Sequence, residues 1–407
     1  MQSTEVQPQS PLISDTEVHA RRRRGLLFLG IACAAVGCTM ALQLGLNANF
    51  VVDEMHLSGQ QQGILEGFRE SCGILALGVL ALMAWMPEPI IAALMLVLLG
   101  LGVGSYTYVD TFTWLIISSV IWSQGLHVWM PLPNSMTLAL AEPGKAGHRL
   151  GQIQAAGNVG SAAGLIVALV LTGSGFHLRP MYLIAGAAAL LGCAACFGIP
   201  RQMKAERPRL VFKRKYSLYY LLCFLEGWRK QICLTFAGYL LVKKYGTPPQ
   251  TMLLLWIAIN AAGWFVAPRV GRWIDRAGEK RTLVFYYISL TAFFVSYALI
   301  ESRYFLWALF IVDNVFFVFT MALTTYVNRI APQEEHTPTL SMGVAMNHIA
   351  AVTMPLVGGL LWDRFGYKWA FLTGVITAAL SIVVAQKLPS RERLAEAPAL
   401  AAPAGAK

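Results

Sequence analysis

Two short segments place ionisable residues inside apolar stretches of the sequence. They read Glu226-Gly-Trp-Arg229-Lys230 and Glu66-Gly-Phe-Arg69-Glu70. At about 100° per residue, the first, fourth and fifth positions of each segment share one side of a helix. Acids and bases on such a stripe can neutralise each other, bind a charged solute or exchange a proton.

Mutual neutralisation predicts that Glu226 pairs with Lys230 and that Arg69 pairs with Glu66 or Glu70. These pairs do not use every charge. Either Arg229 or Lys230 is left over in the first segment, and one carboxylate is left over in the second. A charge at membrane depth is costly, so each leftover group is expected to meet another residue or a solute.

The composition indicates what surrounds these charges. Hydrophobic residues make up 56% of the 407 residues and charged residues 13%, and the mean hydropathy is +0.56. Such a chain cannot hide its apolar surface in one water-soluble core, so the lipid bilayer is its expected partner. The net charge of +11 is gathered in a few short joints, which favours membrane orientation over nucleic-acid binding.

The apolar stretches are long enough to cross a bilayer, which takes about 20 residues, and there are about twelve of them. They run from Leu26 to Val51, Gln60 to Trp85, Ile90 to Tyr108, Phe112 to Leu140, Leu150 to Thr172, Met181 to Ile199, Ser217 to Val242, Met252 to Val270, Thr282 to Ile300, Tyr304 to Tyr326, Leu340 to Trp362 and Trp369 to Gln386. Stretches this long and continuous predict an all-α integral membrane protein.

The basic loop from Arg201 to Lys215 divides the predicted helices into two sets of six. Asn158 and Asn347 fall at matching depths in the fifth and eleventh helices, which favours two repeats. The expected parts are an N-terminal tail (1–24), a first bundle (25–199), a central loop (200–216), a second bundle (217–387) and a disordered tail (388–407). Basic residues gather on one side, so both termini are expected in the cytoplasm of a plasma (bacterial inner) membrane.

One joint carries a recognisable motif, Gly271-Arg-Trp-Ile-Asp275-Arg276-Ala-Gly278-Glu-Lys280-Arg281. It resembles the cytoplasmic signature of the major facilitator superfamily, between the eighth and ninth helices. The segment from Pro355 to Gly366 resembles the connection between the last two helices of that family. The resemblance implies a transporter that works by alternating access, with Gly271, Asp275, Arg276, Gly278 and Arg281 as a conformational latch. In that latch the glycines permit tight turns, while Asp275 is expected to cap a helix start and pair with arginine.

Two features depart from the family pattern. The first half lacks its copy of the motif and has Ala84-Trp-Met-Pro-Glu88-Pro89 instead. The fifth helix has Gly157, Gly160 and Gly164 without the proline and paired glycines of drug–proton antiporters, so multidrug export is not favoured.

The resemblance also implies a central cavity lined by the first, fourth, seventh and tenth helices. The expected cavity residues are Asn47, His127, Arg229, Lys230, Asn314 and His348. Arg229 suits a bidentate contact with a carboxylate or phosphate, and Lys230 a point charge. The candidates for proton coupling are Glu226, Asp313 and Glu70, in that order, while Glu66 and Arg69 complete the charged cluster of the second helix.

These residues predict a secondary active transporter of a small anionic or zwitterionic organic solute, coupled to protons and functional as a monomer. There is no phosphate-binding Gly-rich loop, so neither an enzyme nor a cofactor is expected. Three alternatives remain: a non-transporting assembly factor on the same fold, a membrane enzyme, and a copper importer that uses Met342, Met346 and His348. Sulfur and imidazole ligands suit Cu(I), but the matching Met and His pairs expected on the seventh and eighth helices are missing.

Overall fold

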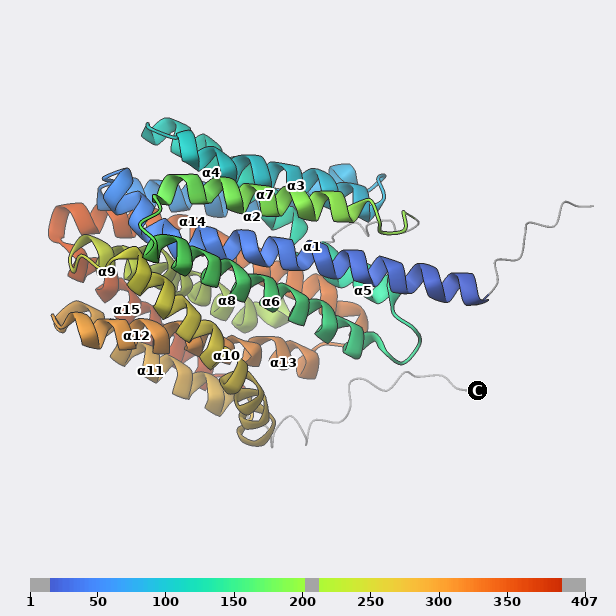
Figure 1. The fold of residues 1–407 in the computed structure, drawn as a ribbon. Coiled ribbons are helices and arrows are strands. Elements are labelled where there is room, and N and C mark those ends of the chain that lie inside the picture. Colours follow the sequence, from blue (N-terminus) through green and yellow to red (C-terminus); the bar gives the residue numbers. More distant parts are fainter. Residues whose placement is uncertain (1–14, 202–211, 390–407) are drawn as a thin grey trace, which may run out of the picture.

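A computed structural model describes residues 15–201 and 212–389, and all regular structure in these ranges is helical (Figure 1). Residues 1–14, 202–211 and 390–407 lie outside the described part. Most of the predicted N-terminal tail, the middle of the predicted central loop and nearly all of the predicted C-terminal tail therefore fall outside it.

The first half contains seven α-helices. They are α1 (Asp15–Asn49), α2 (Gly59–Met83), α3 (Glu88–Gly104), α4 (Phe112–Trp129), α5 (Leu132–Leu140), α6 (Ala146–Gly173) and α7 (Leu178–Cys196). A π-helical turn, Phe50–Glu54, extends α1. The helix starts at Asp15 and not at Leu26 as predicted, because residues with good helix propensity continue it beyond the apolar stretch.

The second half contains eight α-helices. They are α8 (Ser217–Gln231), α9 (Gly238–Lys243), α10 (Pro249–Ala277), α11 (Glu279–Leu299), α12 (Arg303–Phe316), α13 (Met321–Ile330), α14 (Gln333–Phe365) and α15 (Tyr367–Gln386). A π-helical segment, Ile232–Ala237, joins α8 to α9, and a 3₁₀ turn, Phe317–Thr320, joins α12 to α13.

Three predicted spans are interrupted in their interior, by a break or by a change of helix type. The span from Phe112 to Leu140 breaks between α4 and α5, where Pro131 and Pro133 have no amide hydrogen to donate. The spans from Ser217 to Val242 and from Tyr304 to Tyr326 contain the π and 3₁₀ segments. Changes of helix type inside a span often accompany a functional site.

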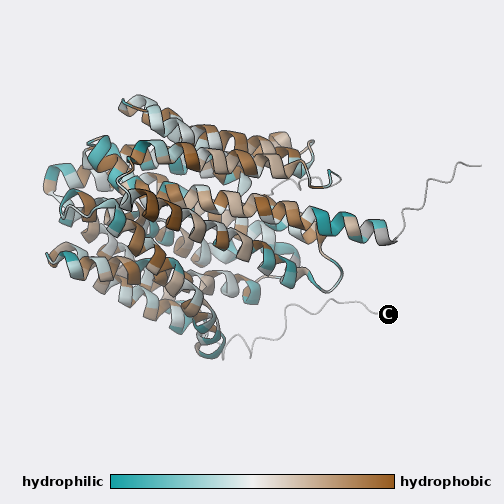
Figure 2. Ribbon diagram, viewed as in Figure 1, coloured by the Kyte–Doolittle hydropathy of each residue, from teal (hydrophilic) through white to brown (hydrophobic). Residues whose placement is uncertain are grey.

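Ten helices or helix pairs in the described ranges are long and apolar enough to cross a membrane. The two predicted spans that do not meet this criterion are α2 and the α8–α9 pair, because each carries a charged segment noted in the sequence. Hydrophobic residues dominate the middle of the bundle and hydrophilic ones its two ends (Figure 2). The twelve predicted crossings are thus consistent with the fold.

The two halves lie side by side along their length (Figure 1), and α14 of the second half packs against α2 of the first. Glycine makes this close approach possible. A Cβ atom at Gly63 would lie 2.1 Å from the carbonyl oxygen of Pro355, and one at Gly59 would lie 2.4 Å from the Trp362 ring. Small residues at four-residue spacing let two membrane helices touch along their backbones.

Hydrogen bonds join the halves at the end of the bundle where α2 begins, which we call the closed end. The amide of Asn49 donates to the carbonyl of Thr247 at 2.9 Å, and the Tyr239 hydroxyl donates to the carbonyl of Leu57 at 2.7 Å. The Asp363 carboxylate on α14 accepts from the backbone amides of Gly59 and Gln60, each at 2.9 Å. These contacts seal one end of the space between the halves.

Candidate functional site

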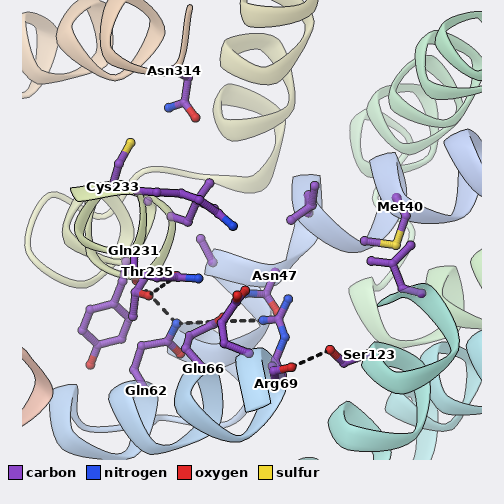
Figure 3. A pocket seen from close by; sticks show the side chains of 18 of the residues that line it. Met40, Asn47, Gln62, Glu66, Arg69, Ser123, Gln231, Cys233, Thr235 and Asn314 are labelled. Carbon is purple, nitrogen blue, oxygen red and sulfur yellow. Dashed lines mark hydrogen bonds and ion pairs between the residues drawn. The ribbon is translucent and has the colours of Figure 1, made fainter. Parts of the chain in front are cut away.

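A cavity of about 250 Å³ lies between the halves at mid-depth (Figure 3). This volume is at the low end of pockets that hold small organic ligands. Figure 3 shows Gln62, Glu66 and Arg69 of α2 on one side and Asn314 of α12 on the opposite side. The polar residues of its wall include Asn47, Gln62, Glu66, Arg69, Glu70, Ser123, His127, Lys230, Gln231, Thr235, Asn314 and His348.

Lys230 provides a cation on the cavity wall. It lies in the last turn of α8 and is half-buried. Among the described residues, its ammonium group has no hydrogen-bond partner and no carboxylate within 4.0 Å. An ammonium group at membrane depth that forms no ion pair within 4.0 Å can contact a negatively charged solute group.

Glu70, His127 and His348 meet beside this cation from three different helices. Nδ1 of His348 on α14 lies 3.2 Å from Oε2 of Glu70 on α2. The rings of His127 on α4 and His348 are edge-to-face with centroids 5.2 Å apart. Nδ1 of His127 lies 2.9 Å from the carbonyl oxygen of Ser123, which can only accept, so Nδ1 carries the hydrogen.

Gly73 makes room for the His348 ring. A Cβ atom at position 73 would lie 2.3 Å from Cε1 and 2.4 Å from Nδ1 of His348. The imidazole therefore enters the surface of α2 one turn beyond Glu70, and any larger residue at position 73 would displace it. His348 thereby links the second half to the first at the level of the cavity.

The Glu66–Arg69 ion pair lies on the same wall, and both side chains are buried. The Arg69 guanidinium lies over the Trp122 ring at 4.4 Å, a cation–π contact. Gln62 donates to Glu66 and to the carbonyl of Thr235 on the other half, each at 3.4 Å. Of the two partners predicted for Arg69, the structure has Glu66, so Glu70 is the carboxylate that Arg69 leaves unpaired.

A second ion cluster is buried inside the second half. Nη2 of Arg229 lies 2.6 Å from Oδ1 of Asp313, and Nη1 lies 3.7 Å from Oε1 of Glu226. The Tyr286 hydroxyl donates to Glu226 at 2.8 Å, and the Arg229 guanidinium lies 4.0 Å from the Phe317 ring centroid. Arg229 is 1% exposed and Asp313 0%, so this cluster is dry.

Two sequence-based expectations are wrong here. Arg229 does not line the cavity, because it is rotated by about 100° from Lys230 on α8 and turns into the second half. The proton-coupling candidates Glu226 and Asp313 lie beside it in the buried cluster and also do not line the cavity. Glu226 pairs with Arg229 and Tyr286 and not with Lys230. The other expected cavity residues, Asn47, His127, Lys230, Asn314 and His348, do line it.

The motif joint has the expected tight turn, since Gly278 has φ +80° between α10 and α11. Asp275, however, lies inside the last turn of α10, and α11 begins after Gly278 without a side-chain cap. The prediction that Asp275 caps a helix start is therefore wrong. Gly271 and Arg276 lie in α10 and Arg281 in α11, and the latch role of these residues stays a prediction.

Met342 and Met346 are partly buried against the hydrophobic core and do not line the cavity. His348, the third residue of the copper hypothesis, contacts Glu70 and His127 in the cavity. Gln62, Gln231 and Trp122 are cavity residues that the sequence analysis missed. The two glutamines carried a usable signal, because uncharged amides inside membrane helices also seek polar partners.

Comparisons with known proteins agree with this geometry. The family model described as Major Facilitator Superfamily matches residues 27–337 and 219–406. The chain belongs to the major facilitator superfamily. A search among curated proteins finds no match.

Solved structures of superfamily transporters share the fold. The nucleoside transporter NupG superposes with a TM-score of 0.71 at 16% identity, covering 88% of this chain and 97% of that one. A bacterial homologue of the human lysosomal transporter Spinster, inward-facing and occupied, gives 0.72 at 13% identity, covering 90% and 96%. A D-xylose–proton symporter gives 0.67 at 15% identity, covering 91% and 98%. This superfamily member is therefore a multi-pass membrane protein with the fold of these transporters.

Proposed function

We propose that the protein carries a small organic solute with an anionic group, and that Lys230 contacts that group. The observation that supports this proposal is the ammonium group of Lys230 on the cavity wall without a carboxylate within 4.0 Å. The small cavity volume favours a compact solute, and Gln62, Gln231 and Asn47 supply neutral hydrogen-bonding groups for its remainder.

Transport is coupled to protons through the cluster around Arg229. Glu226 and Asp313 are two carboxylates beside one guanidinium, all buried. A dry cluster with a net negative charge is unfavourable, and one bound proton makes it neutral. Glu226 lies one helical turn before Lys230 on α8, so the proton and the solute act on the same helix. A fold relative named as a proton symporter agrees with this mode of coupling.

The closed end faces the outside, and both termini lie in the cytoplasm. The basic residues Arg21 to Arg24 at the start of α1, and Arg272, Arg276 and Arg281 around the α10–α11 joint, are at the end opposite the closed end. Cytoplasmic joints of plasma-membrane proteins are enriched in such residues. The conformation is then cytoplasm-facing, and a single chain encloses the whole cavity, as expected for a functional monomer.

The solute contact is tested by thermal stabilisation of the purified protein with a panel of small carboxylates, phosphates and neutral sugars. Wild-type protein and Lys230→Arg are expected to be stabilised by at least one anionic compound, whereas Lys230→Met is not. Stabilisation by neutral compounds alone, or equal stabilisation of Lys230→Met, contradicts the proposal.

The coupling is tested in proteoliposomes with the stabilising compound and an imposed pH difference. Glu226→Gln makes the Arg229 cluster neutral without a proton, so it is expected to equilibrate the solute but not to concentrate it. Asp313→Asn is expected to behave likewise, because it leaves one carboxylate for one guanidinium. If Glu226→Gln and Asp313→Asn both concentrate the solute as wild type does, the cluster is not the proton site.

A further inference from the structure

We propose that Glu70, His127 and His348 form a binding site for a divalent transition-metal ion on the wall of the cavity. The three residues each offer one ligand atom, and these atoms lie within 4.8 Å of one another. They come from α2, α4 and α14, so an ion bound here would connect the two halves of the transporter.

The spacing of the best-defined pair suits a metal ion. Zinc binds imidazole nitrogen and carboxylate oxygen at about 2.0–2.2 Å, which places two ligands of a tetrahedral site about 3.3 Å apart. Nδ1 of His348 and Oε2 of Glu70 are 3.2 Å apart. An ion can therefore replace the hydrogen between these atoms without moving either helix, and the ligand atom of His127 lies within 4.8 Å of both.

Neighbouring residues fix the orientation of both histidine rings, as a metal ligand requires. The Nδ1 hydrogen of His127 is donated to the carbonyl of Ser123, which leaves its Nε2 lone pair free. Metal-binding histidines in proteins usually donate their other ring nitrogen in this way, which fixes the tautomer and the ring orientation. The His348 ring is held by its position against Gly73, where a Cβ atom would lie 2.3 Å from Cε1.

The donor set indicates the class of ion. Two imidazoles and one carboxylate suit zinc, cobalt or nickel, whereas magnesium and calcium prefer oxygen ligands. Three protein ligands leave at least one coordination position for water or for the solute. This differs from the copper site predicted from Met342 and Met346, which would use sulfur ligands.

The positive charge of Lys230 disfavours a metal ion that binds without an anion. It lines the same cavity, so a bare dication and the ammonium group repel each other. An anion that touches both removes the repulsion. This step rests on the proposed function, and it narrows the solute to a complex of a transition metal with a small anionic ligand.

The site is tested by titrating cobalt(II) chloride into the purified protein, which carries a histidine-free affinity tag, and following visible absorption and heat of binding. Wild-type protein is expected to bind one ion with an absorption change typical of nitrogen ligands, and magnesium chloride gives no such signal. Glu70→Gln, His127→Gln and His348→Gln are each expected to weaken binding at least tenfold, as loss of a metal contact commonly does. His148→Gln is the matched control, because His148 is exposed and lies outside the cavity.

Two variants separate this site from the proposed function. Lys230→Met is expected to bind cobalt(II) several-fold more tightly than wild type, although it loses stabilisation by anionic solutes. Binding weaker than about 1 mM in wild type, or wild-type binding by the His127→Gln/His348→Gln double variant with unchanged thermal unfolding, overturns the metal site. Either result leaves the anion contact at Lys230 untouched.

Discussion

The same five-residue pattern occurs once in each half of the molecule, with different outcomes. In both segments a glutamate, a glycine, an aromatic residue and an arginine precede a second ionisable residue. Arg69 pairs with Glu66 on the cavity wall, whereas Arg229 pairs with Asp313 and Glu226 in a dry interior. The local pattern thus sets the pairing three residues apart along a helix, while the neighbouring helices decide whether the pair meets water.

The last residues of the two segments share a location but differ in charge, whereas the two arginines share a charge but differ in location. Glu70 and Lys230 both reach the cavity, and they carry opposite charges. The glycines of both segments lie against α14: a Cβ atom at Gly67 would be 3.1 Å from a Leu356 methyl group, and one at Gly227 would be 2.2 Å from the carbonyl of Asn347. A single helix therefore holds both charged segments in position, one in each half.

Among the predictions, the largest difference between the two segments is expected when the arginine of each is replaced. Arg229→Met leaves the Asp313 carboxylate buried without its cation, which typically costs about 3–5 kcal/mol of stability. Arg69→Met is expected to cost clearly less, because Glu66 lines the cavity and can be hydrated or protonated there. Thermal unfolding in detergent measures both. Arg229→Met/Asp313→Asn should recover much of the loss, and equal losses for both single variants would contradict the comparison.

The two glycines give the next largest difference. Gly227→Ala forces a methyl group against the Asn347 backbone, and such overpacking commonly costs about 1–3 kcal/mol. Gly67→Ala meets a flexible leucine side chain and is expected to cost less than about 1 kcal/mol. The yield and thermal stability of the purified variants report the difference. If the Gly67→Ala protein were less stable than the Gly227→Ala protein, the expectation would be wrong, and the packing of α14 against α2 would matter more than its packing against α8.

A smaller effect is expected at the hydrogen bond that supports the dry cluster. Tyr286→Phe removes the donor to Glu226, which typically lowers stability by about 1 kcal/mol. The matched change in the first half is Ser123→Ala, which removes the donor to the carbonyl of Arg69. We expect Tyr286→Phe to alter proton coupling in proteoliposomes and Ser123→Ala to leave it unchanged.

The smallest effect concerns an ion cluster at the entrance to α8, where Glu335 lies in the first turn of α14, before the apolar stretch that begins at Leu340. Hydrogen bonds from Lys215, and then from Tyr216 and Lys213, lower the pKa of Glu335 to about 2. A depressed carboxyl pKa stabilises the fold fully above the ordinary value of 4.5 and stops doing so as the pH falls through about 2. The slight difference in melting temperature between Glu335→Gln and wild type should therefore stay constant from pH 8 to about 5 and shrink below that. A difference that changes between pH 8 and 6 would point to another titrating group.

Much of the fold could be predicted from the sequence, because most crossings are long apolar stretches and the motif around Asp275 is specific. Of the three interruptions inside spans, the break between α4 and α5 could be predicted from Pro131. The π and 3₁₀ segments in the other two spans have no such local signal. For the site, mid-membrane charges marked the right helices. Helix periodicity alone did not show that Arg229 turns away from the cavity. Arg229 and Lys230 are about 100° apart around the helix, which is enough for one to line the cavity and the other to face the interior of the second half.

Contacts between distant segments were the least predictable part. The His348 ring fits against Gly73 only because α14 and α2 touch, and the two residues are far apart in sequence. Asp363 is a similar case, since it was recognised only as part of a connecting motif. Nothing in the spacing of these residues specifies the register between two helices of different halves.

The carboxylate of Asp363 gives the empty carrier a preferred orientation. Ser58 and Gln61 satisfy only part of the first turn of α2, and the amides of Gly59 and Gln60 depend on an acceptor that belongs to the other half. When the closed end opens, these amides lose the carboxylate and hydrogen-bond to water instead, and loss of a helix cap costs about 1 kcal/mol. That is roughly a fivefold change in population, so without a bound solute the conformation with this end closed is expected to be favoured.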